Sequence, residues 1–297
     1  MNRRKSSKAK ANDWAAKQAQ FRERLESRYI GHASAIDLAA GLMATFTSAP
    51  VDLETPLPRV MVAGPTSAGK SYLAELMATH LNAPVAFVDA SGLTSPGYKG
   101  INLGESLAPL LRNRAIREGH KRGLLVLDEF DKLALGANRD HWLKQVEYNL
   151  LPILNGDTVQ IPDTESFKTI QMSTKNIMVL ALGVFDGAQS NKWESPQLAQ
   201  QQLKKFGFGS ELVSRFSHFI GLRKPTSTEF QELIEREAHN LKQHYQLNKW
   251  SPTIPPRKLK QIAQSAYRSD FGIRGARVEL HANLFALAKS FGEGCPL

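Results

Sequence analysis

The chain has 297 residues, of which 42% are hydrophobic, enough apolar material for one large domain or two unequal ones. Its formal net charge of +10 is compatible with nucleic acid, an acidic protein or a membrane surface as a partner. The single cysteine, Cys295, excludes a disulfide framework or a cysteine-based metal site within one chain. We expect a cytoplasmic protein without membrane contact, because the sequence has no secretory signal and no apolar run of membrane-spanning length.

Residues 1–24 are predicted to be a basic, largely disordered extension, with a helix expected from Trp14 to Leu25. The basic residues of this extension are Arg3, Arg4, Lys5, Lys8, Lys10 and Lys17. We favour a solvated tail, and an arm that binds nucleic acid is the alternative. Aromatic residues are not interleaved with these charges, as a platform for stacking single-stranded bases would require.

Residues 25–222 alternate strand and helix patterns, which predicts a parallel sheet with helices on both faces. The predicted strands are Val60–Ala63, Val85–Asp89, Leu124–Leu127 and Ile177–Leu182. The predicted helices are Ile36–Phe46, Ser71–Leu81, Leu103–Glu118 and Trp142–Leu154. Because the strands are apolar throughout, we expect both faces of the sheet to be covered.

Residues 223–297 are predicted to form a small helical domain. The sequence Thr226 to Glu229 resembles a capping box that begins a long helix, and prolines from Pro252 onward end this helix. Helices are expected at about Lys258–Arg268 and Gly275–Phe291. The expected fold is therefore α/β: a three-layer αβα domain with a phosphate-binding loop, followed by a small α-helical lid domain.

Residues 64–71 form a complete G-x-x-x-x-G-K-[ST] phosphate-binding loop between a predicted strand and a predicted helix. In such a loop the backbone N–H groups face the phosphates, Lys70 reaches the β- and γ-phosphates, and the Ser71 hydroxyl ligates Mg²⁺. The N-terminus of the following helix adds partial positive charge. The predicted nucleotide-binding residues are Gly64, Pro65, Thr66, Ser67, Ala68, Gly69, Lys70 and Ser71.

A second motif, Asp128-Glu129, follows the apolar strand Leu124–Leu127. Asp128 is predicted to hold Mg²⁺, directly or through water, and Glu129 to polarise the attacking water as general base. Charge on the transferred phosphoryl group is often neutralised by arginine. Arg215 and Arg274 are the two candidates, although composition alone favours an ordinary solvated surface position for each arginine.

Together these motifs resemble the AAA+ ATPases of the Clp/HSP100 family, and within them the ClpX type, over about residues 25–284. Beyond the two motifs above, the strings that carry this resemblance are Leu25 to His32, Leu93 to Gly100, Leu150 to Leu154, Thr174 to Ile177, Lys205 to Arg215 and Gly272 to Gly275. The resemblance implies a ring, commonly a hexamer, with ATP and Mg²⁺ bound between subunits.

The resemblance also implies roles for individual residues. Tyr29 and Ile30 would pack on adenine, and Arg274 would act beside the bound nucleotide of its own subunit. Arg215 would reach into the site of a neighbouring subunit. Tyr98 and Lys99 would form a pore loop that grips a polypeptide.

The sequence departs from the family in four places. Lys99 stands where the family has valine, and the sequence has no counterpart of the zinc-binding domain. It contains no Ile-Gly-Phe tripeptide of the kind that docks the protease ClpP, so we do not expect ClpP as a partner. Leu182 and Gly183 occupy the sensor 1 position, while the polar Thr174 and Asn176 lie upstream.

We therefore predict an ATP-hydrolysing protein unfoldase or remodelling chaperone that acts as a ring on protein substrates. The main alternative is a nucleic-acid remodeller, such as a helicase loader or branch-migration motor, which would use the basic tail and surface. A third possibility is a nucleotide switch that assembles on ATP and hydrolyses it slowly.

Overall fold

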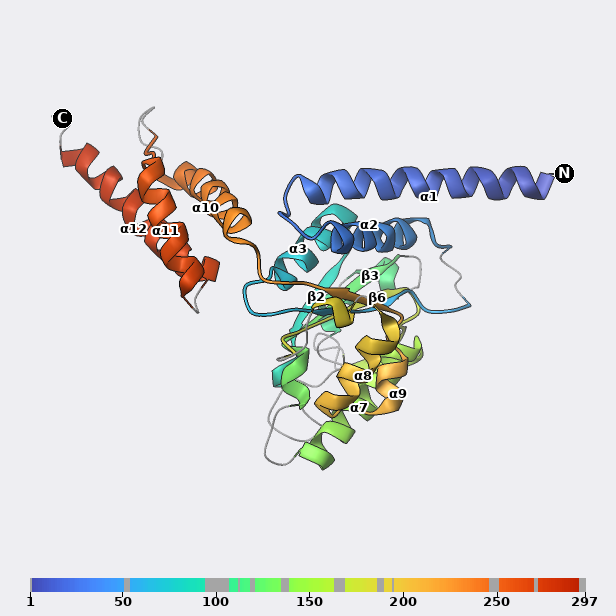
Figure 1. Ribbon diagram of the computed structural model, residues 1–297. Helices are drawn as coiled ribbons and strands as arrows, with labels where there is room; N and C mark the ends of the chain where they lie inside the picture. The colour runs from blue at the N-terminus through green and yellow to red at the C-terminus, as the bar shows by residue number, and fades with distance from the viewer. Residues whose placement is uncertain are drawn as a thin grey trace. The chain divides into compact units, whose positions relative to one another are not determined.

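The computed structural model divides into two compact units, Met1–Arg223 and Lys224–Leu297 (Figure 1). It describes residues 2–50, 54–93, 107–111, 113–117, 121–134, 139–162, 169–185, 190–193, 195–245, 251–269 and 272–293. Among these residues, no helix combines the length and the apolar character needed to cross a membrane.

A five-stranded parallel sheet forms the centre of the first unit; the sequence predicted a parallel sheet and four of its strands, but not β7. Its strands lie in the order β2 (Val85–Asp89), β3 (Gly123–Asp128), β6 (Ile177–Gly183), β1 (Arg59–Ala63) and β7 (His218–Gly221). The register places the last residue of β1, Ala63, beside Gly183 and Gly221. The carboxyl ends of these strands therefore share one edge of the sheet, and their amino ends share the other.

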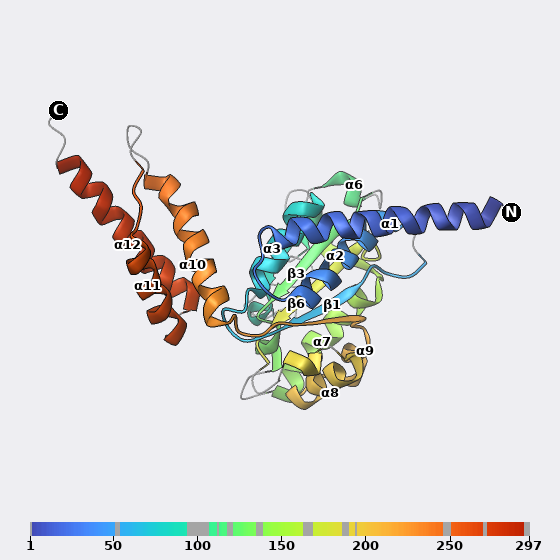
Figure 2. The ribbon, with the colours of Figure 1, turned by 45° about the horizontal axis from the view of Figure 1, so that its top comes forward.

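Helices cover both faces of this sheet (Figures 1 and 2). One face carries α1 (Asn2–Glu26), α2 (Ala33–Ser48) and α3 (Lys70–Leu81), and the other carries α7 (Arg139–Asn155), α8 (Pro196–Phe206) and α9 (Ser210–Ser214). Along β1, Val60 and Val62 belong to the hydrophobic core shared with α1, α2 and α3. Met61 and Ala63 belong to the core on the opposite face, shared with α7, α8 and α9. This alternation confirms the predicted three-layer αβα architecture.

Shorter elements complete the first unit. They are η1 (Ala90–Gly92), α5 (Ala108–Leu111), α6 (Arg114–Arg117), η2 (Phe130–Ala134), η3 (Ser190–Trp193) and an antiparallel hairpin of β4 (Thr158–Pro162) and β5 (Thr169–Ser173). Where one helix from Leu103 to Glu118 was predicted, the described residues form the two short helices α5 and α6.

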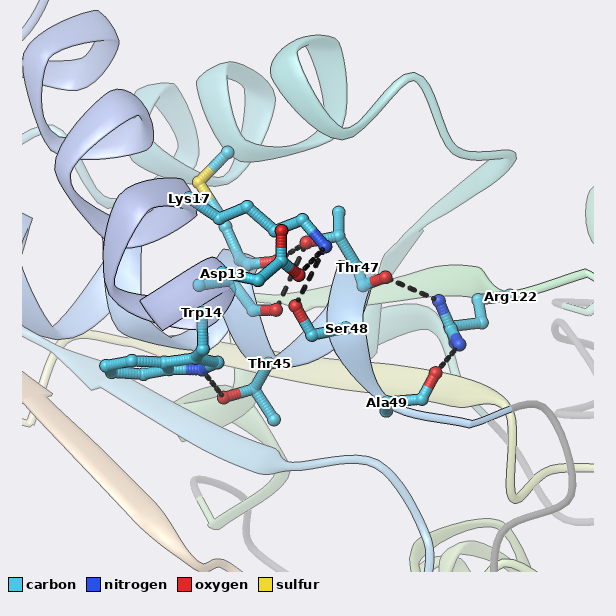
Figure 3. A network of polar contacts seen from close by, with 10 residues as sticks. Asp13, Trp14, Lys17, Thr45, Thr47, Ser48, Ala49 and Arg122 are labelled. Carbon is cyan, nitrogen blue, oxygen red and sulfur yellow. Dashed lines mark hydrogen bonds and ion pairs between the residues drawn. The ribbon is translucent and has the colours of Figure 1, made fainter. Parts of the chain in front are cut away.

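The N-terminal segment differs from the expected disordered extension, because α1 is one helix from Asn2 to Glu26. Its C-terminal half packs on α2 through buried Phe21 and Leu25. Figure 3 shows polar contacts at the same interface, where Trp14 Nε1 donates to Thr45 Oγ1 at 3.2 Å. The segment contains no glycine or proline to interrupt it, so the helix extends from this packed half toward Asn2.

The far end of α2 is tied to the central sheet by Arg122, which immediately precedes β3 (Figure 3). The guanidinium of Arg122 donates to the backbone carbonyls of Thr47 and Ala49. A cation at the C-terminal end of a helix also interacts favourably with the helix dipole. Arg122 therefore fixes the helical layer of α1 and α2 to the sheet.

The second unit is a helical domain of α10 (Ser227–Lys242), η4 (Gln243–Tyr245), α11 (Pro256–Arg268) and α12 (Gly272–Glu293). The predicted capping box is present: Glu229 N donates to Thr226 Oγ1 at 3.2 Å, and Thr226 N donates to the Glu229 carboxylate at 2.7 Å. Phe230, Ile234 and Leu280 lie in the small core that joins the three helices.

A buried arginine holds the amino-terminal edge of the sheet together. The side chain of Arg59 is only 2% exposed, and burial lowers its pKa to about 10, so the guanidinium stays charged at neutral pH. It donates to five backbone carbonyls, those of Leu57, Ile153, Leu154, Thr174 and Ile177. These carbonyls come from the entries to β1 and β6 and from the end of α7, so one side chain joins three segments.

Replacing Arg59 with methionine should destabilise the protein strongly. Methionine fills similar space but leaves five buried carbonyls without this donor, which should lower the free energy of unfolding by about 3 kcal/mol or more. Chemical denaturation followed by circular dichroism measures the change, with the exposed Lys205→Met on α8 as the matched control. Equal midpoints for the two variants would contradict a structural role for Arg59.

Candidate nucleotide-binding site

The phosphate loop lies at the carboxyl edge of the sheet, between β1 and the first turn of α3. Two loop residues, Ser67 and Gly69, have positive φ angles of 66° and 87°. A Cβ added to Gly69 would lie 2.6 Å from the Tyr29 hydroxyl oxygen, so this position requires glycine for space as well as for conformation. The loop therefore curls tightly and leads directly into α3.

Lys70 keeps its amino group over the loop. Its Nζ donates to the backbone carbonyls of Gly64 at 2.8 Å and Pro65 at 3.0 Å. The side chain is 9% exposed, and it stands at the N-terminus of α3. A cation and a helix N-terminus at the same loop form a setting that suits the phosphates of a nucleotide.

Ser71 and Asp128 meet across the site, since Ser71 Oγ donates to Asp128 Oδ2 at 2.7 Å. Asp128 is the last residue of β3 and lies on the same sheet edge as the phosphate loop. These two adjacent oxygen atoms are suitable ligands for Mg²⁺, which is usually bound by few protein groups together with water and phosphate oxygens. Within the described residues, no group of three or more His, Cys, Asp or Glu gathers elsewhere to hold a metal.

Glu129 occupies a strained turn directly after Asp128. Its φ of 54° lies in the left-handed region, and such a conformation costs a non-glycine residue about 1–3 kcal/mol. Hydrogen bonds from Glu129 N to Asp128 Oδ1 and from Lys132 N to Glu129 O hold the turn. The turn leaves the Glu129 side chain exposed beside Asp128, while the next side chain, that of Phe130, is fully buried.

Tyr29 lies against the phosphate loop. Its hydroxyl donates to the carbonyl of Ala68 at 2.7 Å, and its ring stacks on Tyr72 with a centroid separation of 6.0 Å. Burial raises the pKa of this hydroxyl well above its usual range. Tyr29 thus supports the loop from behind, a role that the sequence did not suggest, and adenine contact by Tyr29 and the half-buried Ile30 stays a prediction.

A buried carboxylate occupies the region where sensor 1 was expected. Asp131 is 3% exposed, and its Oδ1 accepts a hydrogen bond of 2.9 Å from Val184 N, just beyond β6. Thr174 and Asn176 precede β6 and therefore lie at the opposite edge of the sheet. Asp131 lies three residues after Asp128, but its burial cannot be read from the sequence.

Arg215 is not brought to the phosphate loop of its own chain. It caps α9, and the nearby Ser217 N donates to Arg59 O at the amino-terminal edge of the sheet. The five residues of β1 separate the two edges by about 15 Å at about 3.3 Å per residue. Arg215 lines a cavity of about 590 Å³ together with Thr55, Pro56, Leu57, Arg59, Leu154, Asn155, Asp157, Ser214 and Ser217.

The structure does not test the predicted roles of three further residues. Arg274 is exposed on α12 in the second unit. Tyr98 and Lys99 fall outside the described residues. Their assigned functions stay predictions.

The sheet, the loop and the Ser71–Asp128 pair define a P-loop nucleotide-binding domain of the α/β class. Residues 55–219, more than half of the chain, match the family of the AAA domain (Cdc48 subfamily), and the chain belongs to this family. The match includes the phosphate loop, Asp128, Glu129 and Arg215, and it ends before Arg274.

The chain is also similar to the ATP-dependent Clp protease ATP-binding subunit ClpX 2 of Wolinella succinogenes. The two sequences are 26% identical over 256 residues, which cover 77% of this chain and 64% of the relative. The chain therefore spans just under two thirds of the length of this relative.

Lys70→Ala should abolish ATP binding, because it removes the cation that the loop holds over its own carbonyls. The fold should persist, since the Tyr29–Ala68 hydrogen bond still supports the loop. Titration with a fluorescent ATP analogue measures the affinity, and Lys205→Ala on the exposed face of α8 is the control. Unchanged binding by Lys70→Ala would refute the assignment of this loop.

Proposed function

We propose that the chain hydrolyses ATP and uses the cycle to unfold or remodel proteins, as a ring of identical subunits that acts without ClpP. The observation that carries hydrolysis is the 2.7 Å contact between Ser71 and Asp128, with the exposed Glu129 next in sequence. These groups provide a place for Mg²⁺ and a carboxylate beside it, which together suit attack by water.

Each residue of the site has a separate task in this proposal. Lys70 and the N-terminus of α3 hold the negative charge of the phosphates, and Ser71 and Asp128 would hold Mg²⁺. When bound, Mg²⁺ and ATP supply a charge-neutralised phosphoanhydride. The Glu129 carboxylate accepts a proton from the attacking water, and its exposure at the sheet edge lets water reach it.

The position of Arg215 supports assembly into a ring. Because Arg215 lies at the opposite sheet edge from Lys70, it cannot neutralise the phosphates held by its own chain. A second copy, oriented so that its phosphate loop faces the cavity beside Arg215, would receive this arginine. Identical contacts repeated head to tail close into a ring, and we propose six subunits by analogy with the family.

Glu129→Gln should retain ATP but lower its turnover by about 10²- to 10⁴-fold, the usual contribution of a general base. The amide keeps the shape of the side chain but cannot accept the proton. Phosphate release measures turnover, and light scattering follows assembly, which trapped ATP should stabilise. Glu75→Gln, exposed on α3, is the control, and normal turnover by Glu129→Gln would exclude Glu129 as the base.

The proposed substrate is polypeptide, on the basis of Tyr98 and Lys99. A bulky aromatic side chain between Gly97 and Gly100 can grip an unfolded chain without reading its sequence, and glycine permits backbone conformations that other residues rarely adopt. The basic residues at the start of α1 favour the alternative, a nucleic-acid remodeller.

Substitution of Tyr98 by alanine should remove the stimulation of ATP hydrolysis by an unfolded protein, because the pore loop loses its grip. The comparison uses an unfolded protein, duplex DNA and single-stranded DNA across a salt series. Stimulation by DNA that persists at high salt would favour the nucleic-acid alternative, whereas an effect that vanishes with salt indicates only non-specific phosphate contacts. Retained stimulation by unfolded protein would refute the pore-loop assignment.

A further inference from the structure

The side chain of Phe130 packs against two rings from another part of the chain. Its ring stacks on Phe208 at a centroid distance of 5.2 Å and an interplanar angle of 16°. Phe216 meets it edge-on at 5.8 Å and 79°. All three side chains are buried, with 3% exposure or less, in the core between the sheet and helices α7 to α9.

These two rings bracket the short helix that ends at Arg215. Phe208 lies two residues before α9, and Phe216 follows Arg215 directly. The start of α9 is also held by α7, because Gly209 N donates to Glu147 Oε1 at 2.7 Å. Burial raises the pKa of Glu147, but the contact itself fixes where α9 begins. Phe130 is thus packed against both ends of the segment that carries Arg215.

On its other side, Phe130 is joined directly to the candidate catalytic turn. It is the residue after Glu129, which has a left-handed backbone, and Glu129 is exposed whereas Phe130 is buried. Asp131 Oδ1 accepts a hydrogen bond from Val184 N, just after β6. The ring of the adjacent Phe185 lies near that of Phe208, with a centroid separation of 6.4 Å. The turns after β3 and β6 therefore converge on the same aromatic cluster.

The polar contacts of Arg215 do little to fix its position. Its Nη2 lies 3.5 Å from a carboxylate oxygen of Glu211, whose side chain is 68% exposed. Its buried Nε has no hydrogen-bond acceptor among the described residues. A long, exposed ion pair of this kind contributes little, so the packing of the flanking rings decides where Arg215 stands.

We propose that Phe130 is a positioning residue: its ring transmits the state of the Asp128–Glu129 turn in one subunit to the Arg215 that this subunit presents to its neighbour. The inference rests on the proposed function, in which Arg215 acts on the nucleotide of another copy. Close-packed aromatic rings cannot yield without moving their neighbours, so a shift of the turn moves α9 as well.

The test separates the two halves of the shared site by mixing subunits. An acceptor, Arg215→Ala, keeps its own ATP site but offers no arginine, and a donor, Lys70→Ala, offers Arg215 but holds no ATP. Each alone should hydrolyse ATP slowly, and the mixture should recover activity wherever a donor faces an acceptor. Phe130→Leu is then added to the donor alone, where it cannot affect hydrolysis through the donor's own inactive site.

Phe130→Leu in the donor should lower the kcat of the mixture about tenfold and leave the KM for ATP unchanged. A displacement of about 1 Å can cost roughly 10²-fold, and every productive ATP site belongs to the unaltered acceptor. The matched control is Phe206→Leu in the donor, since Phe206 packs against the same core and its ring centroid lies 5.0 Å from that of Phe185. Equal activity with the two donors would overturn the inference.

Two further measurements keep the test decisive. Thermal melting compares the two donors, and if Phe130→Leu unfolds, Phe216→Leu alters the same contact from the Arg215 side and should show the same loss. The combined substitutions should cost less than the sum of the two, as expected for residues in contact. If the unmodified donor and acceptor fail to recover activity, the ring proposal itself fails, and the inference about Phe130 fails with it.

Discussion

The buried guanidinium of Arg59 is the interaction on which the geometry of both functional edges depends. It gathers carbonyls from the entries to β1 and β6 and from the end of α7. With β1 and β6 held at their amino ends, their register also fixes the opposite edge, where Gly64 N donates to Gly183 O. The phosphate loop begins at that residue, so its origin is set by a contact five residues away.

This arrangement makes β1 a rigid spacer between two cations. Lys70 stands beyond one end of the strand, and Arg215 lies close to the other. A parallel strand with cores on both faces cannot shorten, so the two cations cannot meet on one phosphate group within this unit. In the proposed function, in which Arg215 acts on ATP, the sheet geometry therefore calls for a second copy to complete the site.

The sequence predicted those parts of the structure that are encoded locally. Four strands were found because each is a continuous apolar run, whereas β7 was missed because only Phe219 and Ile220 separate its polar start from Gly221. The half of α1 from Trp14 to Leu25 was predicted, but its extension to Asn2 was missed because that stretch is mostly basic and polar and has no apolar periodicity. The contiguous loop and Asp128 were recognisable as motifs, but the burial of Arg59 and Asp131 depends on segments distant in sequence.

The turn at Glu129 shows how one backbone conformation can serve two functions. A glycine would adopt its φ of 54° without strain, but it would supply no carboxylate beside Asp128. The strain is tolerated because the neighbouring groups are fixed: Asp128 accepts a hydrogen bond from Glu129 N, and Phe130 is packed against two rings. The same left-handed residue is therefore exposed to water and precedes a buried side chain that packs against Phe208 and Phe216, on either side of the segment that carries Arg215. Any rearrangement that relaxes this backbone must also disturb the packing of Phe130, and in the proposed ring this packing would connect hydrolysis in one subunit to the Arg215 that it presents to the next.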